Sequence, residues 1–91
     1  MLELDKIIRR TTNTIASPMD DELVMMHMEN NAYYGLNSVG RKIWELLEEE
    51  QTLASLCGQL MEKYDVDHAV CQRDVSALIE QLEKAGLVTV A

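Results

Sequence analysis

At residues 33–47 the chain reads Tyr-Tyr-Gly-Leu-Asn-Ser-Val-Gly-Arg-Lys-Ile-Trp-Glu-Leu-Leu, and its periodicity changes within this stretch. The residues before Asn37 suit a β-strand. Asn37 or Ser38 can begin a helix, because a side-chain oxygen there accepts hydrogen bonds from backbone N–H groups of the first turn. The apolar residues that follow recur at helical spacing: Val39, Ile43, Leu46 and Leu47. The stretch therefore predicts a strand that passes directly into a helix of residues 38–49.

Other strand-like segments precede this junction. Residues 6–12 have the β-branched and apolar content of a first strand. Residues 17–21 contain the only proline and two aspartates, which is typical of a connection. Residues 23–28 and 32–36 then flank a short polar turn at 29–31, a pattern that predicts a β-hairpin. We therefore expect a small three-stranded antiparallel sheet.

The first strand of this hairpin is apolar on both sides. Successive side chains of a strand point to opposite faces. One face would carry Val24, Met26 and Met28, and the other would carry Leu23, Met25 and His27. Because both sets are mostly apolar, one face must contact something other than water.

Two more helices are predicted after residue 50. Thr52 can cap a helix whose apolar stripe is Leu53, Leu56, Cys57, Leu60, Met61 and Tyr64. Asp67 can cap another, which should end at Gly86 and has the stripe Cys71, Val75, Leu78, Ile79 and Leu82. Residues 87–90 suit either a short last strand or a cover for the core. The prediction is one α+β domain over residues 1–91, a small three-stranded antiparallel sheet followed by three helices.

Charge and hydropathy exclude several classes of partner. Sixteen acidic and eight basic side chains give a net charge of -8, which repels a nucleic-acid backbone because the basic residues are dispersed. No apolar run approaches the roughly 18 residues of a membrane span, and the acidic N-terminus does not resemble a signal peptide. We expect a soluble cytoplasmic protein that binds neither nucleic acid nor membrane.

No constellation of residues predicts catalysis, a metal or a cofactor. Cys57 and Cys71 lie at apolar helical positions without a CxxC motif, so we expect buried free thiols in a reducing compartment. His68 lies near acidic residues and Cys71, but a surface histidine at a helix start explains it better than a metal ligand. Residues 48–50 are three glutamates without a partnering base, and no serine has a matched histidine and aspartate. We therefore expect a protein that is not an enzyme.

The predicted strand at residues 32–36 lacks the features that block a sheet edge. It contains no charged residue and no proline. Such an edge can accept an incoming peptide as an added strand, with backbone hydrogen bonds supplying affinity and side-chain pockets supplying selection. The pattern alone leaves two alternatives open, a strand inside the sheet and a strand paired in a homodimer.

The sequence closely resembles the PqqD-like family of peptide chaperones, also called RiPP recognition elements. The strand-to-helix junction at residues 33–47 is the most specific part of the resemblance. It continues through Leu53, Leu56, Leu60, Tyr64, Asp65, Val66, Val75, Leu78, Leu82, Gly86 and Leu87, and covers residues 6–90. The tyrosine pair and the Leu-Asn dipeptide look most like the free-standing members from lasso-peptide biosynthesis. The pyrroloquinoline quinone chaperone, which serves a radical-SAM enzyme, is a less similar alternative.

The resemblance implies a winged-helix-like domain without a cofactor that binds the leader segment of a ribosomally made precursor peptide. The leader would add as a strand to residues 32–36, in a cleft with the third helix. Asp74 there could pair with a lysine or arginine of the leader, and apolar anchors should dominate. The peptide-binding residues implied are Met28, Ala32, Tyr33, Tyr34, Gly35, Leu36, Asp74, Val75, Leu78, Ile79 and Leu82.

A separate enzyme would perform the chemistry, in lasso systems a cysteine-protease-like leader peptidase followed by a cyclase. The protein itself would be a monomer or a weak homodimer. Two competing functions remain at this point. One is a winged-helix DNA-binding regulator, although the third helix offers only Arg73 and Lys84 among carboxylates. The other is a structural subunit whose strand edge pairs permanently with another chain.

Overall fold

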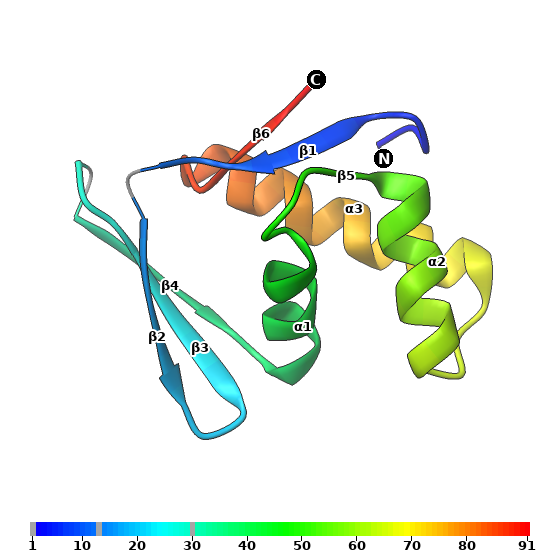
Figure 1. The fold of residues 1–91 in the computed structure, drawn as a ribbon, viewed down its shortest axis with the longest axis horizontal. Coiled ribbons are helices and arrows are strands. Elements are labelled where there is room, and N and C mark those ends of the chain that lie inside the picture. The colour runs from blue at the N-terminus through cyan, green and yellow to red at the C-terminus, as the bar shows by residue number, and fades with distance from the viewer. Residues whose placement is uncertain (1, 13, 30) are drawn as a thin grey trace.

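The computed structural model describes residues 2–12, 14–29 and 31–91. In these ranges the chain forms three helices and two small antiparallel sheets (Figure 1). The strands are β1 (Ile7–Arg10), β2 (Thr14–Met19), β3 (Glu22–His27), β4 (Ala32–Leu36), β5 (Gln51–Thr52) and β6 (Val88–Val90). The helices are α1 (Ser38–Leu46), α2 (Leu53–Lys63) and α3 (His68–Lys84). The predicted α+β class, with an antiparallel sheet ahead of three helices, is confirmed.

The larger sheet has the strand order β2-β3-β4. The predicted hairpin is its β3–β4 pair, in which Met25 lies opposite Tyr34. Of the turn predicted at residues 29–31, Asn30 lies outside the described residues, and Asn31 has a positive φ of 50°. Leu23, Met25 and Leu36 are buried and face the helices. This sheet therefore has one face on the core and one face in solvent.

The connection predicted at residues 17–21 is wrong for its first three residues. Ser17, Pro18 and Met19 belong to β2, which pairs with β3 along its whole length. Only the two aspartates form the turn, and Asp20 has a positive φ of 57°. A proline is tolerated here because β2 is an edge strand, where the missing N–H can face away from the neighbouring strand.

A second sheet with the order β5-β1-β6 was not predicted. Ile8 at its centre lies opposite Gln51 of β5 and Val90 of β6. The first predicted strand therefore exists, but it pairs with two distant segments instead of the hairpin. Residues 88–90 adopt the strand alternative for the end of the chain.

Side-chain caps fix where the first two helices begin. The Asn37 side chain accepts a hydrogen bond from the Gly40 backbone N–H at 2.9 Å, so β4 passes into α1 through a single residue. Thr52 caps α2 through the Ser55 N–H at 3.1 Å. After α3, Gly86 takes a φ of 79°, as expected of a left-handed cap.

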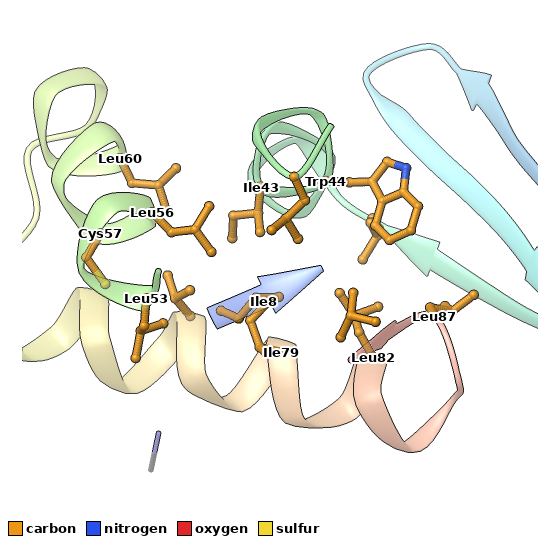
Figure 2. Packing of buried hydrophobic residues seen from close by; sticks show 14 of the residues in the cluster. Ile8, Ile43, Trp44, Leu53, Leu56, Cys57, Leu60, Ile79, Leu82 and Leu87 are labelled. Atoms are coloured by element: carbon orange, nitrogen blue, oxygen red, sulfur yellow. The ribbon is translucent and has the colours of Figure 1, made fainter. Parts of the chain in front are cut away.

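The core lies where the three helices meet the central strand of the second sheet. Figure 2 shows residues of α1, α2 and α3 gathered around Ile8. Leu53 and Leu56 of α2 and Ile79 and Leu82 of α3 are fully buried. The second sheet, β5-β1-β6, thus covers the helical core, while the β2-β3-β4 sheet extends away from it (Figure 1).

The two cysteines are free thiols buried between α2 and α3, as predicted. The Cys71 Sγ lies 3.9 Å from the Cys57 carbonyl oxygen. Burial, and secondly the neighbouring Cys71, raise the pKa of the Cys57 thiol from 9.0 to about 12. Because only the thiolate is a good nucleophile, the Cys57 thiol should be inert in the folded protein.

We expect iodoacetamide to alkylate Cys57 at pH 8 only after the protein is unfolded in urea. Rapid alkylation of Cys57 in the folded protein would contradict this expectation.

The raised pKa of Cys57 also links the stability of the protein to pH. The folded state keeps a proton that the unfolded state releases above its pKa of 9.0, so the free energy of unfolding should fall as the pH rises from about 9 to about 12. Urea titrations of the wild type and Cys57→Ala at several pH values measure this. If the free energy of unfolding falls equally with pH in the two proteins, this pH dependence does not come from Cys57.

Candidate functional site

The two edges of the larger sheet differ in their protection. Both β2 and β4 pair with β3 alone among the described strands. β2 carries Pro18, whereas β4 has the sequence AYYGL with neither proline nor charge. Natural sheets commonly block their edges with such residues. β4 is therefore the unprotected edge of this sheet.

An open pocket of about 340 Å³ lies at the end of β4. Its walls come from the end of β4, the first turns of α1 and the middle of α3. The lining residues are Gly35, Leu36, Asn37, Val39, Gly40, Ile43, Asp74, Val75 and Leu78. Five of these belong to the predicted site, namely Gly35, Leu36, Asp74, Val75 and Leu78. Residues 40 positions apart in sequence thus meet in one mostly apolar hollow.

A glycine permits the close approach of α1 to β4 in this pocket. A Cβ atom added at Gly40 would lie 3.1 Å from Leu36 Cδ2 and 3.2 Å from Leu36 Cβ. Since carbon atoms rarely come that close, a larger residue would push the helix away from the strand. Gly40, Asn37 and Val39 were not predicted as site residues, although they lie in the junction that dominates the sequence pattern.

The tyrosine pair of β4 is divided between the two faces of the sheet. Tyr34 points inward like Leu36, and its hydroxyl is hydrogen-bonded to Gln81 Oε1 of α3. Tyr33 points to the other face and is 73% exposed. Gln81 is a further link between β4 and α3 that the apolar stripe could not predict, because its side chain is polar.

Four other residues of the predicted site lie outside this pocket. Ile79 and Leu82 are fully buried in the core, so their side chains lie beneath the surface of α3. Met28 follows the end of β3 and is exposed. Ala32 begins β4, and its side chain lies outside the described part of the chain.

A second, smaller pocket continues the first along α3. It has a volume of about 230 Å³ and lies between the end of α2 and the start of α3. Its lining residues are Val39, Leu60, Tyr64, Val66, Val70, Cys71, Asp74 and Val75. Val39, Asp74 and Val75 are common to both pockets, so the two pockets adjoin along α3 past the end of β4, and we call them together the groove.

Asp74 supplies the only carboxylate among the residues that line this groove. Its Oδ1 accepts a hydrogen bond from Arg73 Nε at 3.2 Å, and both side chains are largely exposed. Exposed ion pairs of this kind contribute only about 0–1 kcal/mol. Asp74 can therefore leave Arg73 and pair with a cation that binds in the groove.

The lining of the groove is mostly apolar. Among the described residues, no three histidine, cysteine, aspartate or glutamate side chains are grouped so that they could hold a metal ion. His68 is exposed at the first position of α3. In the same residues, no helix combines the length and hydropathy needed to cross a membrane. What the groove offers is an apolar surface beside a strand edge.

Comparisons with known proteins match this architecture. The sequence pattern of the family described as Coenzyme PQQ synthesis protein D (PqqD) matches residues 22–88. The structure of TbiB1 in complex with the TbiA(beta) leader peptide is similar, with a TM-score of 0.82 and 29% identity over 88% of this chain and 93% of that one.

A lasso peptide synthetase B1 complexed with the leader peptide has the same fold, with a TM-score of 0.77 and 23% identity over 90% of this chain and 96% of that one. No curated protein sequence matches the chain. The site is thus built on a fold that other proteins share, and the family match extends from the start of β3 to the start of β6.

Proposed function

The chain belongs to the PqqD family, and from this premise we propose that it binds the leader segment of a ribosomally synthesised precursor peptide and presents it to a separate enzyme. The observation that carries the proposal is the unprotected edge of β4 beside an open apolar pocket. The likeness to TbiB1, which was solved with a leader peptide, supports it.

The leader would bind as a fourth strand against β4. Its backbone would bond to the outer edge of β4, and alternate side chains would point down between β4 and α3. Leu36, Val75 and Leu78 line that space, so apolar side chains of the leader should supply most of the affinity. Asp74 would add selectivity for a nearby lysine or arginine.

The enzyme that receives the leader would be a lasso-type leader peptidase. The tyrosine pair and the Leu-Asn dipeptide of residues 33–37, which resemble those of the free-standing members from lasso-peptide biosynthesis, favour this assignment over a radical-SAM partner of the kind served by the PQQ chaperone. A DNA-binding role is disfavoured, because Arg73 and Lys84 of α3 lie among Asp74, Glu80 and Glu83. We place the binding in the cytoplasm, by a protein that is a monomer or a weak homodimer.

Proline substitutions in β4 test the strand addition. Successive backbone N–H groups of a strand point to opposite edges, so one of Tyr33→Pro and Tyr34→Pro removes a donor from the open edge and the other removes a donor to β3. The variant that keeps a native circular dichroism spectrum should bind the leader about tenfold more weakly. The probe is a synthetic peptide that copies the leader of the precursor encoded beside this gene, titrated by fluorescence anisotropy.

Ala16→Pro in β2 is the matched control. Residues 16 and 18 have the same parity in the strand, so this proline should also remove an N–H that faces away from β3. It alters the protected edge of the same sheet and should leave leader affinity unchanged. If a folded β4 variant binds the leader as tightly as the control does, the peptide does not add to β4.

A further inference from the structure

The larger sheet has a second apolar surface, on the side opposite the helices. Cross-strand pairing places Ile15, Met26 and Tyr33 in one row, and Val24 and Met19 lie on the same face. Ile15, Met19 and Tyr33 are 46%, 61% and 73% exposed. We call these five residues the outer sheet face. Figure 1 shows the β2–β3 hairpin reaching away from the helices, so this face lies apart from the groove along α3.

Contiguous exposed apolar surface is uncommon on a protein that works alone, and it usually marks a site of interaction. The sequence alternation already required that one face of β3 contact something other than water. The structure gives the inner face to the core, through Leu23 and Met25. The outer face is also apolar and has no covering element among the described residues, so only another molecule could bury it.

The charge around this face indicates the chemistry of that molecule. Residues 14–36 contain four carboxylates and not one lysine or arginine. Asp20, Asp21 and Glu22 lie at the turn between β2 and β3. Arg41 reaches this turn from α1, but it donates to the carbonyl oxygens of Asp20 and Glu22 and lies 3.6 Å from Glu45. A complementary surface would be apolar in the middle and cationic at its rim.

The outer sheet face is continuous with the site proposed for the leader. β4 belongs to both, since Tyr34 and Leu36 point toward the helices while Tyr33 points outward. A leader strand added to β4 would widen the same sheet, and its outward side chains would lie next to Tyr33. A protein docked on this face would therefore touch the bound leader as well as the sheet.

We propose that the outer sheet face is the docking surface for the enzyme that receives the leader, through an apolar patch bordered by lysine and arginine residues on that enzyme. This inference rests on the proposed function. It assigns a second surface, separate from the leader groove. The enzyme would bind this surface while the leader is bound to the edge of the same sheet.

Other occupants fit the surface less well. A second copy of this chain would be repelled, because each chain carries a net charge of -8. Pro18 also hinders continuous pairing through β2. An anionic membrane would be repelled by the same carboxylates. A cationic enzyme surface meets neither obstacle.

The test uses two double variants of β2, Ile15→Lys with Met19→Lys and the uncharged Ile15→Thr with Met19→Thr. Both positions are exposed and lie two strands from the open edge of β4, so the fold and the leader affinity should be kept. Binding of the leader-loaded protein to the purified leader peptidase encoded in the same gene cluster is measured by biolayer interferometry. We expect the lysine variant to bind the peptidase at least about tenfold more weakly, and the threonine variant to show a smaller loss of the same sign.

Ile7→Lys is the matched control, because Ile7 is an exposed apolar residue of β1 in the other sheet. It should bind the peptidase as the wild type does. If both double variants bind leader and peptidase like the control, the docking surface is elsewhere. If sedimentation shows a wild-type dimer that the lysine variant dissociates, the face is a self-association surface and the inference is wrong. If the wild type binds no leader at all, the proposed function fails, and this inference fails with it.

Discussion

Replacing Trp44 with alanine is expected to lower the free energy of unfolding by about 3–5 kcal/mol. The side chain is 5% exposed and joins α1 to the core. Its ring also carries the Arg10 guanidinium, whose carbon lies 4.4 Å from the ring centroid, and Arg10 Nη2 donates a hydrogen bond to the Trp44 carbonyl oxygen. Since small domains have a total stability of about 5–15 kcal/mol, this one substitution should bring the protein close to unfolding at 37 °C.

Urea denaturation followed by far-UV circular dichroism measures the effect. Arg10→Met measures the contribution of Arg10, because it removes the cation together with its hydrogen bond to the Trp44 carbonyl oxygen and keeps an apolar side chain over the ring. We expect this variant to lose about 0.5–2 kcal/mol, in the range of a partly buried cation–π contact. A loss below about 1.5 kcal/mol for Trp44→Ala would mean that α1 is held mainly by Ile43 and the Asn37 cap, and that the tryptophan is not central to the core.

The helices could be predicted from the sequence because their signals are local. Each has an apolar stripe at 3.6-residue spacing, and Asn37 and Thr52 cap as expected. The second sheet could not be predicted, because it joins Ile8 to Gln51 and Val90, which lie about half and nearly the whole of the chain away. No pattern in a short window specifies such pairings, which arise from burial of Ile8 beneath the helices.

The sequence identified only some of the residues that line the groove, for a related reason. The apolar stripe of α3 identifies residues that are not in solvent, but it does not say which of them line a groove. Leu78 and Ile79 are consecutive, yet Leu78 lies at the edge of the pocket while Ile79 is completely buried. One residue turns a helix by about 100°, so this distinction depends on where β4 lies over α3. That position is a tertiary feature.

A leader peptide is expected to bind Leu78→Asp about thirtyfold more weakly than the wild type. Leu78 is half-buried on the side of α3 that faces the end of β4, and the larger pocket opens against it. The substitution removes apolar surface from the wall that the leader would cover, and the carboxylate would be buried by the bound peptide. Loss of these contacts together with desolvation of the charge amounts to about 2 kcal/mol, or roughly a factor of thirty in the dissociation constant.

Ala77→Asp separates this effect from the general cost of a charge on α3. Ala77 is the preceding residue of the same helix and is exposed, so the variant has the same net charge and a similar loss of helix propensity. We expect it to bind the leader within about twofold of the wild type, since its carboxylate stays in water. Melting temperatures of the two variants show whether both remain folded at the temperature of the titration. Equal affinities for the two folded variants would mean that the leader does not cover the face of α3 that carries Leu78, and the added strand would then have to be sought away from this groove.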